Sequence, residues 1–110
     1  MKKLTREEVL RIVREFQRKL AELYSDRLKG VYLYGSYARG DARWDSDIDV
    51  AVVLEGPLRQ REESRRASEI ISNVSLRHNC VLMPLFLSEE EFRERPYAVH
   101  RSIAREGVPI

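Results

Sequence analysis

The sequence predicts a small α/β domain in which a mixed β-sheet is flanked by helices. The chain has 110 residues, a length that suits one compact domain with a single core. In some segments the apolar residues recur at helical spacing, and in others they form short β-branched runs. Because the two kinds of segment alternate along the chain, an α/β fold is favoured over an all-helical or all-β fold.

The first predicted element is a helix from Thr5 to Tyr24. Its apolar side chains recur every three or four residues, which places them on one stripe of a helix. Thr5 and Glu8 have the spacing of a capping box, in which both side chains bond backbone N–H groups at the start of the helix. A short β-prone run over residues 31–34 follows and stops at Gly35 and Ser36, where we expect a buried strand to enter a tight turn.

The middle of the chain predicts a second strand and a second long helix. Residues 37–46 have the composition of a short helical turn and a loop, and a strand begins near Asp47 and ends before Gly56 and Pro57. The chain is charged from Leu58 and then shows apolar residues at helical spacing. We expect that helix to pack mainly through its second half, which holds Ala67, Ile70, Ile71 and Val74.

The last third predicts one strand and two helices. Residues 80–87 form the third strand, and Pro84 within it indicates an edge position or a bulge. Ser88 to Glu91 has the pattern of a second capping box at the start of a short helix. Pro96 fits the first turn of a final helix, which Gly107 ends.

Composition narrows the function classes. The 20 basic and 18 acidic residues leave a net charge of +2, so we expect no direct nucleic-acid binding through bulk charge. The longest apolar run, residues 81–87, contains a proline and is far shorter than the roughly 20 residues that cross a bilayer, so no membrane association is expected. Cys80 is the single cysteine, which excludes an internal disulfide and makes the reducing cytoplasm the expected compartment.

Asp47 and Asp49 are the candidate metal ligands. Residues two apart on a strand point to the same side, so these carboxylates would lie together while Ile48 enters the core. At a separation of about 6 Å and an effective dielectric near 20, their repulsion is about 3 kcal/mol. A hard divalent cation such as Mg²⁺ would relieve it, and Mg²⁺ binds carboxylate and phosphate oxygens together.

Gly35, Ser36 and Arg39 are the candidate phosphate ligands. A glycine at the end of a strand lets the backbone approach a phosphate closely, and the amides and hydroxyl that follow can donate hydrogen bonds to it. Arg39 could add a fixed positive group, although an arginine after a turn often only solvates a surface. Together with the two acids, these residues indicate a site for a nucleoside triphosphate.

Residues 35–50 resemble the signature of the nucleotidyltransferases related to DNA polymerase beta. The match consists of Gly35-Ser36, ten intervening residues and Asp47-x-Asp49, and its wider context is similar to that of the minimal nucleotidyltransferases, the MNT proteins. The resemblance implies the polymerase beta-like fold over residues 1–110 as one nucleotidyltransferase domain. It also implies that Asp47 and Asp49 are catalytic and hold Mg²⁺, while Gly35 and Ser36 bind phosphates of ATP or another NTP.

The resemblance further implies an activity and a partner. Members of the family transfer a nucleoside monophosphate, and for this chain we expect AMP from ATP, to an acceptor hydroxyl. Many small members resemble the antitoxin of a pair with a HEPN-domain toxin, so a HEPN protein is the expected partner. Since a domain this small has little room for an acceptor pocket, association with that partner or with a second copy of the chain is expected to complete the site.

One departure from the family pattern keeps an alternative function open. Fully active members carry a third carboxylate on the strand after Asp-x-Asp, where it helps to hold the metal. The corresponding run here, residues 80–87, contains no acid, and neither Glu55 nor Glu89 to Glu91 is placed to replace it. The alternative is a weakly active or inactive protein with the same fold that neutralises its partner by binding.

Each candidate residue also has an ordinary structural interpretation. Taken alone, Asp47 and Asp49 could be two solvated acids at the mouth of a strand, and Gly35-Ser36 could be a turn with a helix cap. Trp44 is interpreted as covering its loop rather than stacking on a base. Only the combined motif at the family's spacing favours a nucleotide site.

Overall fold

The computed structural model describes residues 3–110 and contains a four-stranded mixed sheet in the order β3-β2-β1-β4. Strand β1 pairs antiparallel with both β2 and β4, whereas β2 and β3 are parallel. The α/β class and mixed sheet expected from the sequence are therefore confirmed. The strands are β1 (Leu28–Tyr34), β2 (Ile48–Leu54), β3 (Leu82–Ser88) and β4 (Val108–Pro109).

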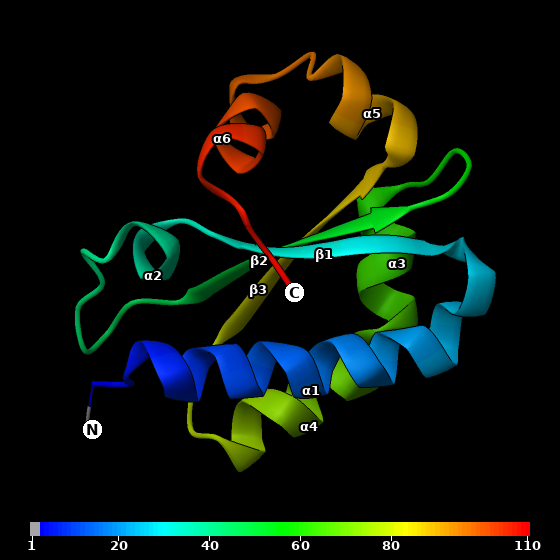
Figure 1. Ribbon diagram of the computed structural model, residues 1–110. Helices are drawn as coiled ribbons and strands as arrows, with labels where there is room; N and C mark the ends of the chain where they lie inside the picture. The colour runs from blue at the N-terminus through cyan, green and yellow to red at the C-terminus, as the bar shows by residue number, and fades with distance from the viewer. Residues whose placement is uncertain (1–2) are drawn as a thin grey trace.

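Helices cover both faces of this sheet (Figure 1). One face carries α1 (Arg6–Tyr24) and α4 (Ser68–Arg77), and the other carries α5 (Glu89–Glu94) and α6 (Ala98–Glu106). Side chains of β2 alternate between the two faces, since Val50 packs in the same cluster as α1 and Ala51 packs in the cluster that contains Ile103 of α6. By this alternation Asp49 lies on the α6 side of the sheet.

Both predicted capping boxes are present. Oγ1 of Thr5 accepts from the Glu8 N–H at 3.1 Å, and the Glu8 carboxylate accepts from the Thr5 N–H at 3.0 Å. Ser88 and Glu91 make the same pair of bonds at 3.1 and 2.9 Å at the start of α5. These local signals set the helix starts where the sequence predicted them.

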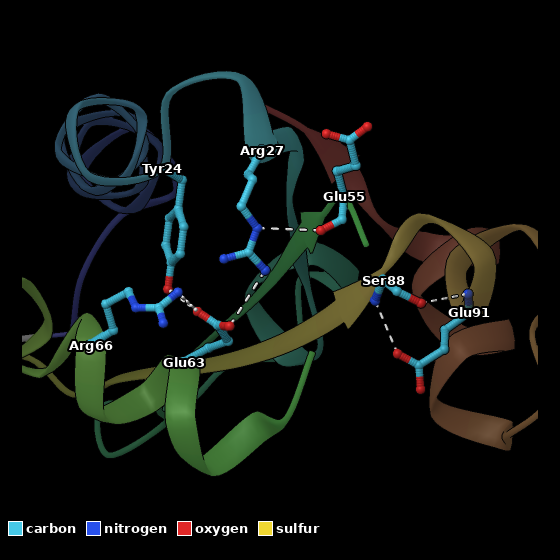
Figure 2. Close-up of polar contacts among 7 residues, drawn as sticks. All are labelled: Tyr24, Arg27, Glu55, Glu63, Arg66, Ser88 and Glu91. Atoms are coloured by element: carbon cyan, nitrogen blue, oxygen red, sulfur yellow. Dashed lines mark hydrogen bonds and ion pairs between the residues drawn. The ribbon is translucent and has the colours of Figure 1, made fainter. Parts of the chain in front are cut away.

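The helix expected after Leu58 is divided in two. It consists of α3 (Gln60–Arg66) and α4, with a turn at the fully buried Ala67 between them. The apolar residues of the second half pack as predicted, since Ala67 and Val74 are buried and α4 lies against α1. The charged first half also contributes a buried residue, because Glu63 of α3 is only 3% exposed. Glu63 accepts from the Tyr24 hydroxyl at 2.9 Å, from Arg66 at 3.1 Å and from Arg27 at 3.4 Å (Figure 2).

The last third of the chain agrees with the sequence prediction at β3 and differs from it at the start of α6 and at β4. Strand β3 is an edge strand, as Pro84 indicated. Pro96 lies before α6 rather than in its first turn, and Tyr97 is the residue that precedes the helix. The pairing of β4 with β1 was not predicted, because a two-residue strand that includes Pro109 has too little local signal. No helix within residues 3–110 has the length and apolar character to cross a membrane.

Candidate active site

The turn after β1 requires a glycine at position 35. Gly35 has a φ of +76°, a region that side chains other than glycine rarely adopt. A Cβ atom there would also clash with Oδ2 of Asp49. Because Tyr34 lies opposite Asp49 in the β1–β2 pairing, the end of β1 and the start of β2 lie side by side. Ser36 follows as the first residue of α2 (Ser36–Arg39), so the predicted turn and short helix are confirmed.

The two aspartates interact electrostatically, as the spacing predicted. Ile48 between them is fully buried, Asp49 is partly buried and Asp47, just before β2, is exposed. Burial raises the pKa of the Asp49 carboxyl, the charge of Asp47 raises it further, and Arg39 opposes both effects. The sequence thus concentrates negative charge at the start of β2, and Arg39 offsets it only in part.

Tyr34 borders Asp49 on the same face of the sheet. Burial, and to a smaller extent the charge of Asp49, raises the pKa of the Tyr34 hydroxyl to about 12. The phenol therefore stays neutral at physiological pH and adds no charge to the site.

Sequence reasoning missed Glu106 at this site. One oxygen of its carboxylate accepts from the Gly35 N–H at 3.3 Å and from Nη1 of Arg39 at 3.1 Å. Arg39 also contacts Asp41 at 3.2 Å, so its guanidinium lies between two carboxylates. The only local signal for Glu106 is an acid in the last turn of a helix, where the dipole disfavours negative charge.

The third strand offers no further carboxylate to the aspartates. Met83 lies beside Asp49 in the parallel register of β2 and β3, and its side chain is half exposed. Among residues 3–110 no group of three or more Asp, Glu, His or Cys side chains could hold a metal ion. The absence of an acid from this strand, noted in the sequence, thus leaves two carboxylates, a set that fits Mg²⁺ when phosphate oxygens and water supply its other ligands.

A cavity of about 190 Å³ lies beside Asp47. It is smaller than the roughly 300 Å³ at which pockets for small molecules begin, so a whole nucleoside triphosphate would have to extend over the open surface. Trp44 lines this cavity and is 60% exposed, and its covering of the loop stays a prediction. Burial raises the pKa of the Cys80 thiol, which keeps it protonated. The lining residues are Leu4, Tyr37, Trp44, Asp45, Ser46, Asp47, Asn79, Cys80 and Val81.

Comparison with known proteins identifies related sequences. Residues 13–106 match the family model described as "Nucleotidyltransferase domain". The chain is 32% identical over 78 residues to "Putative protein adenylyltransferase MJ0141" of Methanocaldococcus jannaschii, a match that covers 71% of this chain and 78% of that protein. It is 42% identical over 55 residues to "Protein adenylyltransferase MntA" of Thermococcus cleftensis, covering 50% of this chain and 54% of that protein.

Solved structures share the fold. A crystal structure described as "a putative nucleotidyltransferase from Sulfolobus solfataricus" has a TM-score of 0.69 at 24% identity, covering 94% of this chain and 80% of that chain. A crystal structure of a toxin-antitoxin with AMP-PNP has a TM-score of 0.61 at 20% identity, covering 86% of this chain and 69% of that chain. Both likenesses show the arrangement of helices and strands described above.

Proposed function

The chain belongs to the nucleotidyltransferase domain family, and from this premise we propose that it transfers AMP from ATP to an acceptor hydroxyl in a Mg²⁺-dependent reaction. We further propose that it is the antitoxin partner of a HEPN-domain toxin in the cytoplasm, with residues 1–110 forming one domain. The observation that carries the proposal is the close approach of Gly35 to Asp49, which joins the candidate phosphate turn to the candidate metal ligands.

Each predicted site residue has a role in this proposal. Asp47 and Asp49 hold the metal, and their mutual repulsion is the electrostatic reason to bind one. The Gly35 turn and Ser36 bind the β and γ phosphates, and Arg39 is held at that turn by Glu106. When bound, Mg²⁺ neutralises charge on the phosphates and orients them for displacement.

The proposed reaction is a substitution at the α-phosphorus of ATP. The acceptor hydroxyl oxygen forms a bond to the α-phosphorus of ATP and loses its proton to water, while the bond from the α-phosphorus to the bridging oxygen breaks and its electron pair stays on that oxygen. Pyrophosphate leaves, so the turn that holds the β and γ phosphates holds the leaving group. Hydrogen-bond donors of the Gly35 turn would thereby stabilise the negative charge that develops on the leaving pyrophosphate.

The names of related proteins support the choice of AMP and of the partner. The relatives from M. jannaschii and T. cleftensis are named as adenylyltransferases that act on protein. Chains of the same fold occur in toxin-antitoxin crystal structures, one of them with AMP-PNP. A protein acceptor would also supply the second wall that the small cavity beside Asp47 does not provide.

The proposal is tested with ATP labelled at the α-phosphate. The chain is incubated with labelled ATP, Mg²⁺ and a co-expressed HEPN-domain protein, and label on protein is measured. We expect label on the HEPN protein with the wild-type chain, and none with Asp47→Asn and Asp49→Asn combined or with EDTA. Asp26→Asn, an exposed acid in η1 (Ser25–Arg27), is the matched control and should transfer normally. Failure of the wild-type chain to label any protein would refute transfer.

The alternative function is neutralisation by binding alone, and the observation that favours it is Met83 beside Asp49, where an acid would complete the metal site. In that case the chain with both aspartates replaced would still bind the HEPN protein and relieve its toxicity. Under the transfer mechanism, the same chain would bind the partner without relieving toxicity. A growth assay with both chains distinguishes the two functions.

A further inference from the structure

We infer that the Glu106 carboxylate occupies the place of a phosphate group at the Gly35 turn, and that a nucleotide must displace it to bind. The inference rests on the proposed function, because it concerns the same turn. It starts from one oxygen, Oε1 of Glu106, which accepts from both the Gly35 N–H and the Arg39 guanidinium. A backbone N–H and an arginine are the donors that also bind phosphate oxygens.

The tight turn at Gly107 and the pairing of β4 with β1 hold Glu106 beside the Gly35 turn. Glu106 is the last residue of α6, and Gly107 after it bonds the Ile103 carbonyl at 2.8 Å. A Cβ atom at Gly107 would clash with that carbonyl, so the chain turns tightly there. Residues 108 and 109 then pair with β1, whose end leads into Gly35. The carboxylate is therefore carried on a short segment anchored next to the turn.

The position of Glu106 is electrostatically unusual. An acid at the carboxyl end of a helix is opposed by the helix dipole, and the Glu106 side chain is only 17% exposed. Glu106 also belongs to α6, which covers the side of the sheet where Asp49 lies. Its pairing with Arg39 and the Gly35 N–H offsets these costs.

Displacement of this carboxylate weakens phosphate binding. A phosphate that enters the turn must replace both of its contacts, so the apparent affinity of any phosphate ligand falls by the fraction of chains in which the turn is free. Glu106→Gln keeps the shape and an acceptor oxygen but removes the charge. The glutamine side chain should therefore yield its place to phosphate more readily.

The test compares Glu106→Gln with Glu94→Gln, since Glu94 is the exposed last residue of α5 and loses the same charge. Calorimetry measures binding of inorganic tripolyphosphate without metal and of ATP with Mg²⁺. We expect Glu106→Gln to bind both probes about threefold to tenfold more tightly than wild type, and Glu94→Gln to match wild type. Unchanged or weaker binding by Glu106→Gln would overturn the inference, and weaker binding of ATP with Mg²⁺ alone would make Glu106 a metal ligand instead.

A measurement on the wild-type chain guards against a variant that fails to fold. Tripolyphosphate should shift the NMR signal of the Gly35 amide, which donates to Glu106, and an absence of a shift at saturation would refute displacement. If the proposed function fails but the inference holds, the result is different. Glu106→Gln then binds tripolyphosphate more tightly than wild type does, while neither chain binds ATP with Mg²⁺. If wild type binds ATP through Asp47 and Asp49 and Glu106→Gln does not differ, the function stands and the inference fails.

Discussion

Gly35 lies so close to Asp49 that any side chain at position 35 would collide with the Asp49 carboxylate. This contact links a positive-φ turn to a candidate metal ligand on the neighbouring strand. A change at either residue is therefore expected to disturb the other, and this relationship sets the first prediction.

Gly35→Ala should abolish nucleotide binding, because the new methyl group displaces the Asp49 carboxylate. Gly40→Ala is the control for a methyl group at a positive φ, since Gly40 has open space around its Cβ position. The backbone costs differ, because Gly35 at ψ −155° lies in a region that essentially only glycine adopts, whereas Gly40 at ψ 11° is left-handed. We expect a loss of about 3 kcal/mol of unfolding free energy for Gly35→Ala and about 1 kcal/mol for Gly40→Ala. Urea denaturation and calorimetry with ATP and Mg²⁺ separate the two effects, and equal binding by both variants would contradict the prediction.

At neutral pH, Asp49→Asn should increase the free energy of unfolding of the metal-free protein. A carboxyl whose folded-state pKa is raised binds its proton more tightly in the folded chain than in the unfolded chain. The stability it contributes is complete below its ordinary pKa of 3.8 and is lost as pH rises through the raised value. Denaturation from about pH 3 to about pH 8 should show this loss in wild type and in the exposed Asp26→Asn control, but not in Asp49→Asn. An identical pH profile for all three chains would rule this out.

Glu63→Gln should destabilise the fold by about 2 kcal/mol without affecting nucleotide binding. The change removes the charge that Arg27 and Arg66 share, and these arginines are partly exposed, which limits the cost relative to a fully buried pair. Thermal unfolding with Glu62→Gln as control measures the effect, since Glu62 is the exposed neighbour and contacts only Arg59, at 3.8 Å, among the ion pairs of residues 3–110. Equal melting temperatures for the two variants would show that the Glu63 network contributes no stability.

Met83→Asp should strengthen Mg²⁺ binding severalfold. The new carboxylate would lie beside Asp49 in the sheet register, and a third oxygen ligand increases the affinity of a site for a hard cation. Met83 is 49% exposed, so the substitution does not bury an unpaired charge. Leu76→Asp, an exposed position on α4, is the control for added charge. Calorimetric titration with MgCl₂ measures the affinity, and equal affinities in the two variants would argue against this geometry.

Local patterns predicted much of the fold and most of the candidate site. Thr5 and Glu8 predicted the start of α1, because a capping box involves residues three positions apart. The spacing of Asp47 and Asp49 predicted their electrostatic interaction, because alternation along a strand depends only on backbone geometry. The resemblance in residues 35–50 predicted the family, and the match of residues 13–106 to the nucleotidyltransferase domain family confirms it.

By itself, then, the sequence determined the α/β class, the starts of α1 and α5, the glycine turn and the pair of acids, since each depends on neighbours along the chain. Only the tertiary structure decided that Glu63 is buried under Tyr24 and that Glu106 reaches Gly35, 71 positions away. Locally, Glu63 resembles an exposed glutamate, and Glu106 differs from one only by its place in the last turn of a helix, which does not indicate its partners. Their partners are brought to them by the packing of helices on opposite faces of one sheet, which depends on the whole core rather than on any single segment.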